Sequence, residues 1–164
     1  YVIVFMANGF TFSSVLYCLM TSALIVITVI DERTYQIPVS MNLFIGLIGV
    51  IMTVYDYKHI LSHLIGMVCV SLFLYALYYF SSGQAIGGGD IKLMATAGLV
   101  LGVKNIVFAF FLACILGSII HTIRMKVSKK NNLLAMGPYL SVSIYIAALW
   151  GNCFWSWYLG LMGL

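Results

Sequence analysis

The stretch Gly87-Gly88-Gly89-Asp90-Ile91-Lys92-Leu93 sets a carboxylate at the boundary between two strongly apolar parts of the chain. Asp90 is one of only four acidic residues among 164. An acidic side chain at the edge of a lipid bilayer is costly, so such residues mark functional sites. The glycines before it carry no side chains, and another polypeptide can therefore approach this backbone closely. The stretch thus indicates a membrane fold with a site where an apolar helix begins.

The composition supports this class of protein. The chain is 63% hydrophobic and 7% charged, with a mean hydropathy of +1.11. A soluble domain carries roughly 25% charged residues. Apolar runs extend over the whole length, which a secretory signal alone does not explain. The net charge of +4 is dispersed along the chain, so we expect the lipid bilayer as a partner and no nucleic acid.

The apolar runs predict a polytopic transmembrane bundle in an all-α fold. We expect about six helices after a short N-terminal stub, since a helix needs about 20 apolar residues to cross a bilayer. The chain opens inside an apolar run, so we expect upstream sequence to be missing. Residues 1–164 are interpreted as a single membrane domain. The expected helices cover residues 12–30, 39–54, 60–80, 91–102 and 105–124 and a final region to 164.

Positive charges collect on one side of such a bundle. If the side holding Asp31 is called the inside, the loops at 81–92 and 124–134 also lie inside and the loop at 55–59 lies outside. This excess of cations predicts that the inside is the cytoplasm. The count requires residues 91–102 to cross the membrane, although twelve residues reach only about 18 Å. The inside cations are Arg33, Lys92, Arg124, Lys126, Lys129 and Lys130, against Lys58 and Lys104 outside.

The same count places Asp31 and Asp90 on one side and Asp56 on the other. Two carboxylates close together do not both ionise readily and can share one proton. The ionised partner can take a proton from water while the protonated partner donates to a peptide carbonyl. This chemistry needs no metal and no other cofactor. Asp31 and Asp90 are therefore the candidate catalytic pair.

Each of these acids also has a simpler interpretation. Asp31 alone is typical of a charge that ends a transmembrane helix, and Asp90 alone is typical of a helix N-cap. Their shared side, the scarcity of acids and the glycine loop favour the catalytic interpretation. Glu32 is a rival to Asp31, but it would point about 100° away around a continued helix.

The remaining ligand-type residues do not form a convincing metal site. His59 and His63 are four residues apart and could share a helix face as metal ligands. On the predicted outer side only Asp56 could join them, so interfacial residues are favoured. His121 is isolated and indicates a packing or headgroup contact. No C-x-x-C pair exists, so we interpret the four cysteines as small buried hydrophobes: Cys18, Cys69, Cys114 and Cys153.

Aromatic residues near the C-terminus are typical of an outer membrane interface. They are Trp150, Trp155, Trp157 and Tyr158.

Several motifs resemble those of the bacterial type IV prepilin peptidases. Residues 31–38, DERTYQIP, resemble the family's first aspartate motif, in which Pro follows Asp by seven residues. Residues 87–93, GGGDIKL, resemble its G-x-G-D motif, which continues with an apolar residue, Lys and Leu. Residues 137–140, GPYL, and the apolar residues 147–151 resemble its downstream elements. The motifs occur in the same order and spacing over most of the chain.

The resemblance implies an aspartic endopeptidase of the bacterial inner membrane. Such enzymes cut the basic leader from prepilins and pseudopilins after a glycine, at the cytoplasmic face. Carried over, Asp31 and Asp90 form the catalytic dyad. Gly87, Gly88 and Gly89 would form the loop that the substrate approaches, and Lys92 would give electrostatic support. Pilus assembly, type II secretion and DNA uptake are equally open as the process served.

The sequence also departs from larger family members. These carry an N-terminal cytoplasmic region, often with two C-x-x-C pairs, and methylate the new N-terminus with S-adenosylmethionine. That region is not part of this chain, and Gln84 stands where many relatives have Glu. An N-methyltransferase activity therefore stays an open question.

Two other classes remain as alternatives. Presenilins and signal-peptide peptidases also use G-x-G-D, and Tyr55-Asp56 resembles their Tyr-Asp pair. However, Asp56 is expected opposite Asp90, and their Pro-Ala-Leu element is missing. A non-enzymatic membrane channel or assembly component would also be apolar, but a channel would need charges within its spans. The acids here are expected at helix ends.

Overall fold

The computed structural model describes residues 1–81, 86–127 and 136–163, and all regular structure in these ranges is helical. The all-α prediction is therefore confirmed. The single-domain interpretation stays a prediction. In chain order the elements are α1 (Val2–Asn8), α2 (Phe12–Thr34), α3 (Val39–Tyr55), the 3₁₀ turn η1 (Tyr57–His59), α4 (Ile60–Phe80), α5 (Gly88–Val127) and α6 (Gly137–Met162).

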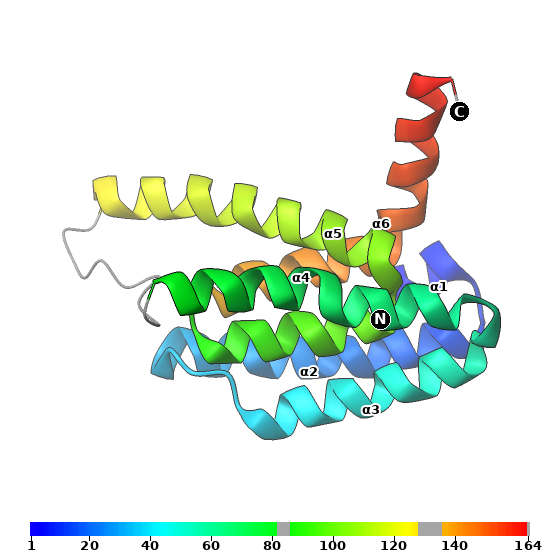
Figure 1. The fold of residues 1–164 in the computed structure, drawn as a ribbon, viewed down its shortest axis with the longest axis horizontal. Coiled ribbons are helices and arrows are strands. Elements are labelled where there is room, and N and C mark those ends of the chain that lie inside the picture. The colour runs from blue at the N-terminus through cyan, green and yellow to red at the C-terminus, as the bar shows by residue number, and fades with distance from the viewer. Residues whose placement is uncertain (82–85, 128–135, 164) are drawn as a thin grey trace.

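Helix α5 consists of two arms that reverse direction at Gly102. This glycine has φ 75° and ψ 170°, a conformation that side chains with a Cβ rarely adopt. The arms, 88–101 and 103–127, correspond to the two separate helices expected from the sequence. In Figure 1 the second arm runs back toward the end of the bundle at which the first arm starts. The first arm therefore extends from one end of the bundle to the other.

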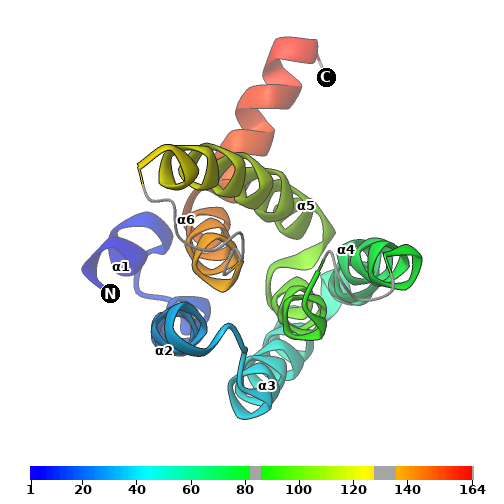
Figure 2. The same cartoon turned by 90° about the vertical axis from the view of Figure 1, so that its left-hand side faces the viewer.

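The first arm of α5 lies against α3 and α4, and the second arm packs with α6 (Figure 2). The core between these helices is apolar and closely packed. Its largest fully buried side chains include Met20, Ile27, Ile45, Leu93, Met94, Ile106, Leu140 and Ile144.

Two glycines bring α4 and α5 into backbone contact. A Cβ added to Gly66 would lie 2.7 Å from the carbonyl oxygen of Gly98, and one added to Gly98 would overlap the backbone of Gly66. Small residues allow this approach where helices associate without a hydrophobic driving force from water. The crossing fixes the first arm of α5, which carries Asp90 at its start.

In the described ranges, three helical segments are long and apolar enough to cross a membrane: Phe12–Thr34, Tyr57–Phe80 and Gly88–Ile120, the last of which includes the reversal at Gly102. Helix α3 is also apolar but shorter. Large apolar side chains such as Leu61, Leu72 and Phe111 are exposed on the outside of the bundle. This outward apolar surface fits a multi-pass membrane protein.

We expect Gly98→Ala to destabilise the fold, because the new methyl group meets backbone atoms that cannot rotate away. The cost should be about 1–3 kcal/mol, as for other overpacked cores. Thermal unfolding in detergent measures it. Gly117→Ala is the matched control, since a Cβ there meets only Tyr139 Cδ2 at 3.8 Å. Equal unfolding temperatures for the two variants would contradict the close crossing.

Candidate active site

Asp31 lies in the last turn of α2 and is only 4% exposed to solvent. The expectation that this helix ends before Asp31 is wrong, because the helix continues to Thr34. It ends at Tyr35, which has the left-handed φ of 54° and donates its N–H to the Asp31 carbonyl at 2.9 Å. Glu32 is exposed, as the helical geometry predicted.

The Asp31 carboxyl is held by the start of another helix. Gly137 is the first residue of α6, and its backbone N–H donates to Asp31 Oδ2 at 2.9 Å in a buried hydrogen bond. Figure 1 shows that the end of α2 and the start of α6 lie at the same end of the bundle. This contact joins two of the segments that carry the motifs described above.

Asp90 lies in the first turn of α5 and is partly buried. The sequence predicted Asp90 as the N-cap of this helix. The helix begins at Gly88 instead, so Asp90 lies inside its first turn. An acidic side chain is favoured there because the helix dipole is positive at its N-terminus. The backbone of Gly87 hydrogen-bonds the Asp90 carboxyl, and the Asp90 N–H donates to the Gly87 carbonyl at 3.1 Å.

Both carboxylates line one cavity of about 350 Å³. They are close enough to interact electrostatically. All residues predicted for the site border this cavity, and their catalytic and binding roles stay predictions. The lining residues are Asp31, Tyr35, Gln36, Ile37, Val39, Gly87, Gly88, Gly89, Asp90 and Lys92.

The glycine loop fits closely against the segment between α2 and α3. A Cβ on Gly89 would lie 3.0 Å from Ile37 Cβ, whereas one on Gly88 would meet nothing within 4 Å. Asn42 of α3 is buried and donates through Nδ2 to the Gly89 carbonyl at 3.5 Å. Sequence reasoning missed Asn42, although an amide in the first turn of an apolar helix was a visible signal.

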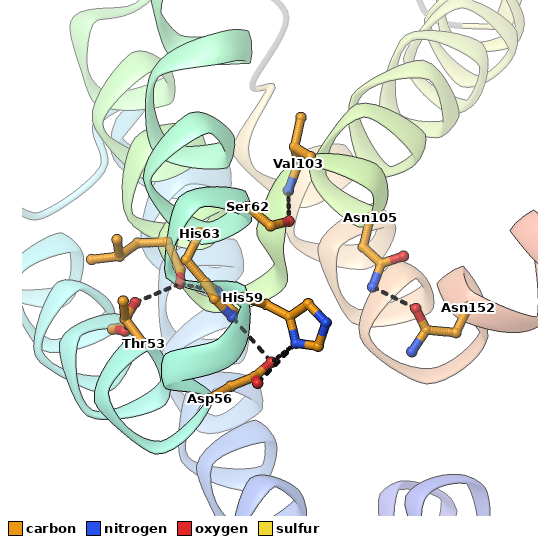
Figure 3. A network of polar contacts seen from close by, with 10 residues as sticks. Thr53, Asp56, His59, Ser62, His63, Val103, Asn105 and Asn152 are labelled. Carbon is orange, nitrogen blue, oxygen red and sulfur yellow. Dashed lines mark hydrogen bonds and ion pairs between the residues drawn. The ribbon is translucent and has the colours of Figure 1, made fainter.

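Asp56 lies at the other end of the bundle, in a separate polar cluster with His59 and His63 (Figure 3). His59 Nδ1 lies 2.9 Å from Asp56 Oδ1, and His63 Nε2 lies 3.6 Å from Asp56 Oδ2. The hydrogen bond from His59 is the main cause that holds the pKa of Asp56 below its usual range.

The other ring nitrogen of His63 contacts the backbone of α5. Its Nδ1 lies 2.9 Å from the carbonyl oxygen of Leu99. A carbonyl only accepts hydrogen bonds, so Nδ1 carries the proton and Nε2 faces Asp56. In the described parts of the chain, no group of three His, Cys, Asp or Glu residues could hold a metal ion. The side chain of His121 is outside the described residues.

The C-terminal aromatic residues gather at this same end. Trp155 donates its indole N–H to the carbonyl of Lys104 at 3.0 Å, beside the reversal of α5. Figure 1 shows the last part of α6 turning away from the bundle here. Asp31 and Asp90 therefore share one end of the bundle, and Asp56 and the aromatic residues share the other.

Known proteins share the sequence pattern of this chain. The profile of the type IV leader peptidase family matches residues 18–122. The chain is 31% identical over 159 residues to a prepilin leader peptidase/N-methyltransferase of Legionella pneumophila, covering 93% of this chain and 55% of that protein. A protein of the same name from Neisseria gonorrhoeae is 32% identical over 149 residues, or 86% of this chain and 51% of that protein.

A third relative of that name, from Bacillus subtilis (strain 168), is 28% identical over 141 residues, or 84% of this chain and 56% of the relative. The chain thus spans about half the length of the curated relatives it matches. No solved structure matches it.

The lowered pKa of Asp56 predicts a pH-dependent contribution to stability. A carboxyl whose folded pKa is depressed stabilises the fold above its unfolded pKa, near 3.8, and this contribution is lost as the pH falls through the folded pKa. Because the side chain is 37% exposed, the effect should not exceed about 1 kcal/mol.

The unfolding temperatures of Asp56→Asn and the unsubstituted chain should therefore differ at neutral pH, and the difference should shrink as the pH falls from 3.8 through the lower folded pKa. Glu32→Gln, at an exposed position of α2, is the control and should show little difference at either pH. A difference for Asp56→Asn that persists unchanged in acid would contradict the assignment.

Proposed function

Because the chain belongs to the type IV leader peptidase family, we propose that it is a membrane aspartic endopeptidase that removes the leader peptide of type IV prepilins or pseudopilins. One observation carries this proposal. Asp31 and Asp90, from two distant motifs, line the same cavity together with the glycine loop. The cavity thus combines two carboxylates with an approach that side chains do not block.

The two carboxylates would divide acid and base roles around one water molecule. The ionised member takes a proton from the water, and the resulting oxygen nucleophile attacks the carbonyl carbon of the scissile peptide bond. The protonated member donates its proton to the carbonyl oxygen as negative charge develops there. As the tetrahedral intermediate collapses and the C–N bond breaks, the carboxyl that took the proton from water gives it to the leaving amine, and the other carboxylate takes back the hydroxyl proton of the intermediate. The apparent pKa values of such a reaction belong to the pair.

The loop would admit the substrate as an extended chain. Gly87 and Gly88 are exposed, and their lack of side chains leaves the cavity accessible beside Asp90. Cleavage after a glycine of the leader junction would suit this confined approach, since that residue adds no side chain either. Lys92 is exposed at the border of the cavity and would act electrostatically. The cation excess that the sequence predicts for the side holding Asp31 supports assignment of this site to the cytoplasmic face.

The peptidase step requires no cofactor in this proposal. The relatives are also named N-methyltransferases, and our proposal covers the peptidase reaction alone. The presenilin-like alternative would pair Asp56 with Asp90. It is disfavoured because Asp56 borders a different cavity and interacts with two histidines. A non-enzymatic assembly component would bind prepilin without cutting it.

Substitution of the aspartates tests the proposal. We expect Asp31→Asn and Asp90→Asn each to reduce leader removal by at least about 100-fold, because general acid–base catalysis contributes this much or more. The assay reconstitutes the chain in lipid vesicles with a prepilin that retains its leader, and follows cleavage on a gel. Asp56→Asn is the matched control and should cleave at nearly the unsubstituted rate. Robust cleavage by either of the first two variants would reject the dyad.

The pair also predicts the pH dependence of the reaction. One carboxyl must be ionised and the other protonated, so activity should fall on both sides of an optimum. Initial rates of leader removal across the acidic and neutral range would measure this profile. A flat profile, with protein stability verified at each pH, would count against acid–base use of the pair.

A further inference from the structure

We infer that Gly137 is the positioning residue for Asp31. Its backbone N–H holds the Asp31 carboxyl, and its missing side chain leaves the space that the carboxyl occupies. This inference rests on the proposed function, in which Asp31 is one member of the catalytic pair. Gly137 itself touches no reacting atom in this role.

The hydrogen bond is short and shielded. The Gly137 N–H lies 2.9 Å from Asp31 Oδ2, and both residues are buried. Among the residues that the structure describes, Gly137 is the only hydrogen-bond donor to this carboxyl. A buried charged or polar group without a partner is costly. The amide therefore sets which way the carboxyl faces.

The start of α6 suits this task. The first backbone N–H groups of a helix have no partner within the helix and point outward, and they favour a negative group. The next residue, Pro138, has no N–H, so Gly137 supplies the donor at this point of the first turn. Asp31 and Gly137 are far apart in sequence, so this hydrogen bond is a tertiary contact. It holds the start of α6 against the end of α2.

The space beside Gly137 is occupied by the side chain of Asp31. A Cβ added there would lie 2.6 Å from Oδ2, 2.8 Å from Cγ and 2.9 Å from Cβ of Asp31. Real Cβ atoms essentially never approach so closely, and the Asp31 side chain is short and buried. An alanine would therefore displace the carboxyl, the α6 backbone or both.

Asp90 also contacts a glycine, but this glycine lies in the loop directly before it. The Gly87 backbone hydrogen-bonds its carboxyl, and a Cβ on Gly87 would lie 3.1 Å from Asp90 Oδ2. Gly87 is exposed whereas Gly137 is buried. Asp31 is thus the more tightly held of the two carboxyls.

Gly137→Ala tests the positioning role, and the chain offers a closely matched control. Gly151 lies on the same helix, and a Cβ there would meet Asn105 Oδ1 at 2.5 Å and Cγ at 2.8 Å. Both substitutions add the same methyl group against a buried polar side chain of similar size. Only one of these side chains is a member of the proposed pair.

In the vesicle assay with a leader-bearing prepilin, kcat of Gly137→Ala should fall about 100-fold, the effect of misplacing a catalytic group by roughly 1 Å. KM should change little, because the substrate approaches along the glycine loop. Gly151→Ala should lose thermal stability but retain kcat per folded molecule. A normal kcat for Gly137→Ala, or an equal loss in both variants, would overturn the inference.

A second measurement does not depend on activity. In an Asp31→Gly background the three atoms that meet the new Cβ are absent, so Gly137→Ala should lower the unfolding temperature much less than in the unsubstituted chain. Gly151→Ala should lower it equally in both backgrounds. Additive effects of Asp31→Gly and Gly137→Ala would overturn the inference. Failure of the unsubstituted chain to cut prepilin would instead reject the proposed function.

Discussion

The architecture around the cavity depends on satisfying one buried carboxyl. Asp31 is almost inaccessible, and an acidic group in such a place requires a donor. The Gly137 amide supplies it across the interface of α2 and α6. Because the bond requires the start of one helix to meet the end of another, it also aligns these helices. A polar group that would otherwise oppose burial therefore becomes a constraint on how the bundle closes.

The second constraint is the close contact of α4 with the first arm of α5. Gly66 and Gly98 let the two backbones touch, and Gly102 ends the arm with a reversal that a residue with a Cβ would strain to adopt. The arm has Asp90 near its start and lies beside the Asp56 cluster at its end. The same short segment thus brings Asp90 to Asp31 and keeps it away from Asp56.

Much of this arrangement follows from patterns along the chain. Apolar runs predict the helices, and counting crossings places Asp31 and Asp90 at one end. The extension of α2 through Asp31 was not predictable, because it depends on the left-handed conformation of Tyr35. The contact of Gly137 with Asp31 was also invisible, since it involves a backbone amide and an absent side chain. A motif shows that a glycine is present, but only the packing shows which atom occupies its space.

The two carboxyls of the cavity sit in different surroundings, and this difference bears on how such a site would work. Asp31 is buried in a helix end and held by a buried amide. Asp90 follows an exposed loop whose Gly88 has open space around it. Both carboxyls nevertheless line the same cavity. Acid–base catalysis by a pair requires a defined distance between its members, and an Asp31 held by the Gly137 amide would give Asp90 a fixed partner.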